Sequence, residues 1–137
     1  MNGQKFLLGA LAAFVVGFGL SGLWHVVLLA DFYESRAAGV MRQQPLFWVI
    51  GLAYLIVGLI MAYMYPKGYE GGSPASEGLK FGAIIGLLWW FPTNLVLYGV
   101  LESSFSLVIV DGAWHVVEEA LAGLALAMVY GRVQARR

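Results

Sequence analysis

The last apolar segment of the chain contains an unusual stretch, VDGAWHVVEE, at residues 110–119. Four ionisable side chains interrupt a run that otherwise suits the interior of a lipid bilayer: Asp111, His115, Glu118 and Glu119. On a helix that turns about 100° per residue, the first three fall within roughly 60° on one face, and Glu119 lies at its edge. Because charge inside a membrane span costs free energy, this face is read as a functional site by default.

The composition of the chain is that of a membrane protein. Of its 137 residues, 61% are apolar and 12% are charged, whereas soluble domains contain about 45–50% and about 25%. The length suits a single transmembrane domain, residues 1–137. A net charge of zero and the lack of a basic aromatic patch argue against nucleic acid as a partner. The absence of cysteine excludes disulfides, thiolate metal sites and covalent c-type haem.

Four apolar stretches are each long enough to cross a bilayer as a helix, which takes about 20 residues. They occupy residues 6–30, 46–65, 79–101 and 107–130. Pro66 should end the second span, because proline cannot continue a helix. The polar residues 31–45 read as a loop. The sequence therefore predicts an all-α fold, an integral membrane bundle of four transmembrane helices in the lipid bilayer.

The positive charges predict the orientation of these spans. Four spans place both ends of the chain, and the loop between the second and third spans, on one side of the membrane. That side carries six of the eight lysines and arginines: Lys5, Lys67, Lys80, Arg132, Arg136 and Arg137. Only Arg36 and Arg42 fall on the other side. The positive-inside rule then predicts that both termini are cytoplasmic.

Polar residues of the other spans fall at a similar depth to the 110–119 stretch. With a rise of about 1.5 Å per residue, His25 lies near the outer end of the first span and Asn94 in the outer half of the third. Asp111 lies near the outer end of the fourth span. We therefore expect an outward-facing polar pocket in the bundle. Its expected walls are the tryptophans at positions 24, 89, 90 and 114.

A short internal sequence repeat relates the first and fourth spans. The sequence GLWHVV at residues 22–27 is matched by GAWHVV at residues 112–117. Because these spans are antiparallel, an inverted pair would set His25 and His115 across a pseudo-twofold axis, as in many transporters. Six residues are a short match, so chance is the competing explanation.

The polar groups are candidates for a binding site for a metal ion or a small polar ligand. The candidate ligand-binding residues are His25, Asn94, Asp111, His115, Glu118 and Glu119. Two imidazoles and two carboxylates among them form the candidate metal set, His25, Asp111, His115 and Glu118. Such ligands suit zinc, iron or manganese. A b-type haem held by the two histidines is less favoured, because no further histidine serves the site. Two neutral, buried imidazoles are the simpler alternative.

Two other functions stay open. A small proton- or cation-coupled transporter would use Glu118 as its coupling carboxylate, although the apolar residues that follow it, Ala122, Ala125 and Met128, offer no polar path inward. A structural or assembly subunit would use the polar cluster only for hydrogen bonds between helices. No Walker loop, nucleophile elbow or HExxH motif is present, so the sequence leans against an enzyme without deciding the question.

Two stripes of small residues allow helices to approach closely. Gly17 and Ser21 form one, and Gly82 and Gly86 form the other. Stripes of this kind pack helices either within a bundle or between chains. A homo-oligomer through either face is therefore an open expectation.

The second half of the chain carries a loose pattern: a Gly-rich third span, a Thr-Asn-Leu step, and a fourth span that opens with an Asp and a Trp. Its residues are Gly82, Gly86, Thr93, Asn94, Leu95, Asp111 and Trp114. Over residues 78–131 this pattern resembles small four-helix bacterial membrane proteins of unknown function. The resemblance implies a four-helix fold in the bacterial inner membrane and supplies no activity. His115, Glu118 and Glu119 match no fixed pattern of those proteins.

Overall fold

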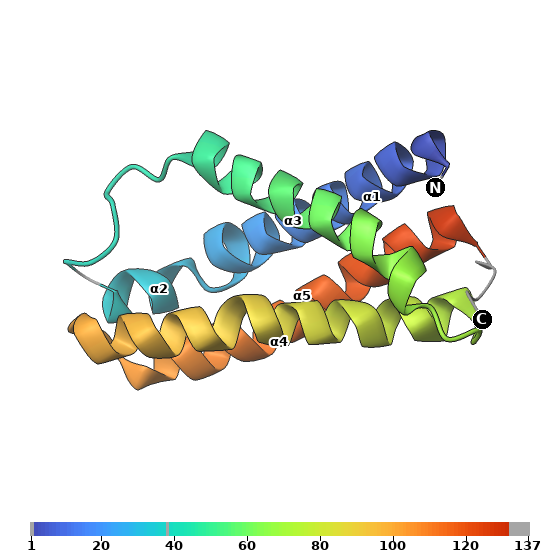
Figure 1. Cartoon of the computed structure of the whole chain (residues 1–137). Helices are drawn as coiled ribbons and strands as arrows, with labels where there is room; N and C mark the ends of the chain where they lie inside the picture. Colours follow the sequence, from blue (N-terminus) through green and yellow to red (C-terminus); the bar gives the residue numbers. More distant parts are fainter. Residues whose placement is uncertain (1, 38, 132–137) are drawn as a thin grey trace.

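The structure is a computed structural model, and it describes residues 2–37 and 39–131 (Figure 1). In this part of the chain all regular structure is helical, which confirms the predicted all-α membrane fold. The elements are α1 (Gly3–Gly22), the π-helix η1 (Leu23–Leu28), α2 (Ala30–Arg36), α3 (Phe47–Gly68), α4 (Pro74–Val100) and α5 (Phe105–Tyr130). Four helices are long and apolar enough to cross a membrane: α1 with η1, α3, α4 and α5.

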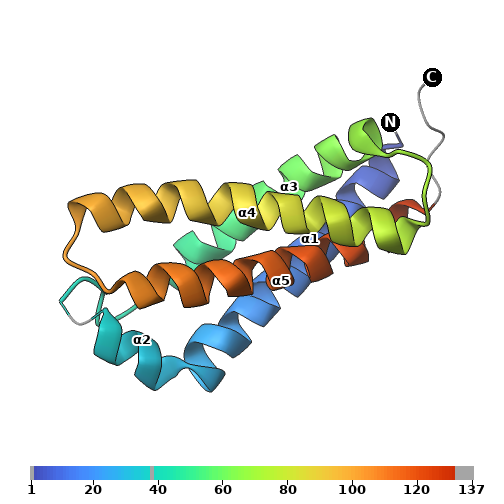
Figure 2. The ribbon, with the colours of Figure 1, turned by 90° about the horizontal axis from the view of Figure 1, so that it is seen from below.

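The four spans form a bundle that is open on one side. The helix α4 packs along α5, α1 packs on α5, and α3 packs on α1 (Figures 1 and 2). The helix α3 makes few contacts with α4 and α5. In Figure 1, α3 and α4 approach each other near Gly68 and Pro74 and diverge toward Phe47. The bundle is therefore closed at one end and open between α3 and α4 at the other.

Both ends of the described chain lie at the closed end of the bundle. The Lys5 ammonium group donates a hydrogen bond to the carbonyl oxygen of Tyr130 at 2.7 Å, so the start of α1 meets the end of α5. Following the predicted orientation, we call this end inner and the end that holds α2 outer. Three of the charges used for that prediction lie outside the described residues: Arg132, Arg136 and Arg137.

Glycines bring α4 and α5 into backbone contact. A Cβ atom on Gly82 would overlap the carbonyl oxygen of Glu119, and one on Gly86 would overlap that of His115. From the other side, a Cβ on Gly123 would lie 2.8 Å from the Cα atom of Gly82. The predicted small-residue stripe of the third span thus packs inside the chain.

The stripe of the first span is also covered. A Cβ on Gly17 would lie 3.2 Å from the ring of Tyr54 on α3, and Ser21 is buried. Neither stripe is exposed to a second copy of the chain. An oligomer built through these faces would require the bundle to open.

Pro66 does not end its helix, so that prediction was wrong. The helix α3 continues through Pro66 to Gly68. Proline removes the N–H group that would bond to the carbonyl oxygen of Ala62. The hydroxyl of Tyr130 donates a hydrogen bond to that oxygen at 2.6 Å instead. A neighbouring helix therefore satisfies the carbonyl that proline leaves free.

The segment predicted as a polar loop, residues 31–45, contains the short helix α2 at its start. The backbone leaves the helical conformation at Leu29, which separates η1 from α2. The helix is held to the bundle by Tyr33, whose side chain is buried although its neighbours Glu34 and Ser35 are exposed. Tyr33, together with a hydrogen bond from Arg36 to the Ser106 hydroxyl at 2.9 Å, thus gives this segment a fixed place at the outer end.

Candidate functional site

The outer end of the first span is wound as a π-helix, over Leu23–Leu28. The Leu29 N–H group bonds to the Trp24 carbonyl oxygen at 2.9 Å, a separation of five residues. Short π-helical segments inside α-helices occur frequently at functional sites. This one contains His25, and no feature of the sequence pattern predicted it.

Asp111 is the centre of the outer polar cluster. The Nε2 atom of His25 lies 2.8 Å from the Oδ1 atom of Asp111, and the Tyr33 hydroxyl donates a hydrogen bond to the same oxygen at 2.6 Å. The Trp24 indole N–H donates in turn to the Tyr33 hydroxyl at 2.9 Å. These bonds join the end of the first span, α2 and α5 at one buried carboxylate.

The hydrogen bonds also indicate the charge of His25. Its Nδ1 atom lies 2.9 Å from the carbonyl oxygen of Ser21, which can only accept. Its Nε2 atom faces the carboxylate of Asp111. Acceptors at both nitrogens favour the doubly protonated imidazole. In that form His25 makes an ion pair with an ionised Asp111, and the two charges cancel.

Tyr33 lies outside the membrane spans and keeps its proton. Burial raises the pKa of its hydroxyl, and the hydrogen bond to Asp111 and the negative charge of that carboxylate raise it further. The hydroxyl therefore remains a donor to Asp111 well into the alkaline range. Tyr33 was not among the predicted site residues, and its only signal in the sequence was an aromatic pair, Phe32 and Tyr33, in a segment otherwise read as a polar loop.

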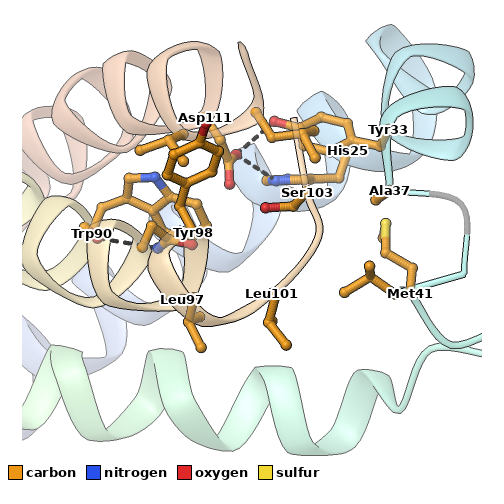
Figure 3. Close-up of a pocket in the computed structure, with 14 residues that line it drawn as sticks. His25, Tyr33, Ala37, Met41, Trp90, Leu97, Tyr98, Leu101, Ser103 and Asp111 are labelled. Carbon is orange, nitrogen blue, oxygen red and sulfur yellow. Dashed lines mark hydrogen bonds and ion pairs between the residues drawn. The ribbon is translucent and has the colours of Figure 1, made fainter. Parts of the chain in front are cut away.

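A cavity of about 290 Å³ opens beside the ion pair, among α2, the segment after it, α4 and α5 (Figure 3). Its polar lining includes His25, Tyr33, Asn94 and Asp111. Its apolar lining includes Ala37, Val40, Met41, Leu97, Leu101 and Val108. The cavity therefore combines a polar floor with an apolar rim.

Asn94 is the polar group that α4 brings to the cavity. It is half-buried, and its amide nitrogen donates a hydrogen bond to the carbonyl oxygen of Trp90 at 3.1 Å. Thr93, the neighbouring polar residue, is exposed on the other side of the helix. Only one of the two residues of the Thr-Asn step therefore faces the site.

The predicted tryptophan walls are correct for one residue of the four. Trp90 lines the cavity. Trp24 and Trp114 stack on each other, with ring centroids 4.2 Å apart and planes 3° apart. Trp89 packs edge-on against Tyr54. Trp24 and Trp114, the two tryptophans of the internal sequence repeat, thus stack face to face where the first and fourth spans cross.

His115 lies behind the cavity and is buried. Trp90 stacks on its ring at 4.0 Å between centroids, and its Nδ1 atom bonds to the Asp111 carbonyl oxygen at 3.0 Å. His25 bonds to the carbonyl four residues before it in the same way. The two imidazole centroids are 6.2 Å apart. The two histidines of the repeat therefore make the same bond to the carbonyl four residues earlier, but only His25 reaches the cavity.

Glu118 and Glu119 form a second polar group, deeper in the bundle. Glu118 is 0% exposed, and its two oxygens accept hydrogen bonds from the Tyr54 hydroxyl at 2.6 Å and the Trp114 indole at 2.8 Å. Glu119 is 1% exposed, and its Oε1 atom has no hydrogen-bond partner among the described residues. This atom faces α1, where a Cβ on Gly17 would lie 3.7 Å from it. Tyr54, which was not among the predicted site residues, joins α3 to this group.

The four predicted metal ligands are not arranged around one point. In residues 2–37 and 39–131, no group of three or more His, Asp or Glu side chains could hold a metal ion. His25 and Asp111 pair with each other, and the Nδ1 atom of His115 is 3.7 Å from the same carboxylate oxygen. Glu118 is engaged by Tyr54 and Trp114. The donor set therefore does not fit a metal centre, nor a haem between the two histidines, because His25 directs its Nε2 atom at Asp111.

Comparisons with known proteins place the chain in a family. A family model described as "Predicted membrane protein (DUF2177)" matches residues 6–128. Searches of curated proteins and of solved structures found no match. The family match spans all four transmembrane helices and both polar groups. The chain therefore belongs to this family of predicted membrane proteins, whose function is not known.

Proposed function

We propose that the protein binds a small uncharged molecule in its outer cavity, through a hydrogen-bonding head placed against Asp111. The observation that supports this proposal is the pairing of His25 with the buried carboxylate of Asp111 at the floor of a cavity whose remaining walls are largely apolar. Small-molecule sites combine apolar walls with a few polar groups in this manner. At about 290 Å³, the cavity lies at the small end of the usual range of about 300–1,000 Å³.

The polar atoms at the floor favour a ligand that donates a hydrogen bond. The Oδ1 atom of Asp111 accepts from both His25 and Tyr33, and the Oδ2 atom has no hydrogen bond to the described residues. Asn94 donates one of its two amide N–H groups to Trp90, and its side-chain oxygen is a second acceptor. A hydroxyl group suits these acceptors.

The ion pair also argues against a charged ligand. The charges of His25 and Asp111 cancel each other, and no lysine or arginine lines the cavity. A charged head would therefore enter an environment of low dielectric constant without a counter-ion, at a cost of several kcal/mol. A metal ion meets the same difficulty.

Binding of three matched four-carbon probes tests the proposal. Ligand-observed NMR would compare 1-butanol, butylamine and butyrate with the protein in deuterated detergent micelles. We expect saturation transfer to 1-butanol to exceed that to the two charged probes, and to fall in Asp111→Asn. Asp31→Asn is the control, because Asp31 is an exposed carboxylate at the same end of the molecule. Equal transfer in Asp111→Asn and wild type would overturn the proposal.

A second candidate is a proton- or cation-coupled transporter that uses Glu118. Two adjacent carboxyl groups buried in the bundle, one with an oxygen lacking a partner, favour it. Proton or sodium flux in liposomes, lost in Glu118→Gln with the fold retained, would support this function.

The third candidate, a structural subunit, is favoured by the bonds of Tyr54 and Tyr33, which each join two helices. It predicts that substitutions change stability and nothing else.

We also propose that both termini lie in the cytoplasm of a bacterial inner membrane, because the positive charges favour that orientation. The chain has no cysteine, so single cysteines can report the topology directly. Ser35, on α2, and Ser76, at the start of α4, are exposed at opposite ends of the bundle. An impermeant maleimide should label Ser35→Cys in intact cells and Ser76→Cys only after lysis. The reverse pattern would overturn the orientation.

A further inference from the structure

We infer that the ligand is a membrane lipid with an uncharged, hydroxyl-bearing head, and that its chain leaves the cavity sideways between α3 and α4. This inference rests on the proposed binding function and adds the class of ligand and its route of entry. It depends on the rim of the cavity rather than on its floor.

The rim is made of exposed apolar side chains. Leu97 and Leu101 of α4 line the cavity, and each exposes more than a third of its surface. In Figure 3 both side chains point away from Asp111 and toward the ribbon of α3. Met41 lines the same mouth and is also exposed. A ligand seated on Asp111 would therefore meet apolar surface as it leaves toward α3.

The helix α3 does not close this side. The cavity is lined by the first span, α2 with the segment after it, α4 and α5, and no residue of the fully described α3 is among its walls. The first turns of α3 are exposed, including Phe47, Trp48 and Leu52. Because α3 diverges from α4 at this end (Figure 1), the mouth opens toward the region that lipid chains fill in a membrane.

Size and charge together select the class of occupant. A cavity of about 290 Å³ takes a small head and only a few carbon atoms. The rest of a longer ligand would lie along Leu97 and Leu101 and the outer turns of α3, where apolar area is available. The cancelled charges of His25 and Asp111 select an uncharged head. A lipid of the monoacylglycerol type has both properties.

Photo-crosslinking tests the inference on the full chain in nanodiscs. The probe is a monoacylglycerol with a diazirine in its acyl chain. We expect crosslinks concentrated on the outer half of α4, the start of α3 and the segment around Met41. An excess of unlabelled monoacylglycerol should compete, whereas a fatty acid and an alkylamine of equal chain length should not. In Asp111→Asn the competed labelling should fall about tenfold, the effect of one hydrogen bond to a charged group.

A bulky residue at the mouth tests the route of entry. Leu97→Trp should block the competed labelling, because Leu97 lines the cavity where it opens toward α3. Leu88→Trp is the matched control, since Leu88 is exposed on the same helix away from the cavity and should leave the labelling unchanged. Labelling spread evenly over all four spans, or unchanged by Leu97→Trp, would overturn the inference. If 1-butanol still bound to the wild-type protein, the proposed function would stand alone; if it did not, both would fail.

Discussion

The inner and outer ends of this bundle are held together in different ways. At the inner end, α4 and α5 meet through glycines in backbone contact, and Tyr130 and Lys5 tie neighbouring helices to backbone carbonyls. At the outer end, side chains separate the helices, and hydrogen bonds to Asp111 join them. Backbone contact leaves no room for a ligand, whereas side-chain bridges leave a cavity. The difference indicates that close backbone packing holds the inner half together, whereas the outer half contains the cavity.

The largest effect should come from the glycine contact. Gly82→Ala should lower the free energy of unfolding by about 3 kcal/mol or more, because the new Cβ atom would overlap the Glu119 carbonyl oxygen and the backbones would have to separate. Gly99→Ala on the same helix meets nothing within 4 Å and should be neutral or stabilising by up to about 1 kcal/mol. Thermal unfolding of both variants checks the contrast. Equal stability of the two variants would mean that α4 and α5 are not in close contact.

The next effect should come from the deep polar group. Tyr54→Phe removes one of the two donors to Glu118 and should cost about 1–3 kcal/mol, because that carboxyl group is fully buried. A double-mutant cycle with Glu118→Gln should show the two positions to be coupled. Binding of 1-butanol should be retained throughout. Its loss in Tyr54→Phe would show that the deep group and the outer cavity form one site.

A smaller, pH-dependent effect should come from Tyr33. Tyr33→Phe removes a donor to Asp111 and should cost about 1 kcal/mol at neutral pH. The pKa of Tyr33 is raised in the folded state, so above pH 10, roughly, the unfolded chain releases this proton and the folded chain keeps it. Stability contributed by Tyr33 is therefore present below that pH and lost above it. Unfolding measured from about pH 8 to about pH 11 should show the two proteins converging; a constant gap would contradict this.

The smallest effect on stability should come from Asn94. Asn94→Leu should change the free energy of unfolding by less than about 1 kcal/mol, since its one hydrogen bond is to a carbonyl of its own helix. It should nevertheless reduce binding of 1-butanol, because it places an apolar side chain in the cavity wall. Thr93→Leu, on the exposed side of the helix, should leave both stability and binding unchanged. Equal binding by the two variants would exclude Asn94 from the site.

Much of the fold could be predicted because a membrane span needs only length and apolar composition. The burial of Asp111, His115, Glu118 and Glu119 was also predictable, since residues three and four apart share a helix face. The rules for helix ends were less reliable. Pro66 lies inside α3 because a side chain from another span satisfies the carbonyl it frees.

The partners of the polar groups were harder to predict. Asp111 and Glu118 lie on one helical face, yet Asp111 meets His25 and Tyr33 at the cavity, whereas Glu118 is closed off by Tyr54 and Trp114. Both tyrosines reach these carboxyl groups from other elements. Helical periodicity describes one helix at a time and contains no information about its neighbours.

The sequence by itself determined four spans, the depth of the polar residues, and the small-residue faces through which helices approach. These properties follow from hydropathy and from the fixed rise and turn of a helix. The tertiary structure decided which of those residues face one another. It separated the predicted cluster into an outer ion pair beside a cavity and a deep pair of glutamates. The physical reason is that packing sets the rotation and tilt of each helix against its neighbours, and these angles determine whether a polar side chain meets another helix, a cavity or the lipid.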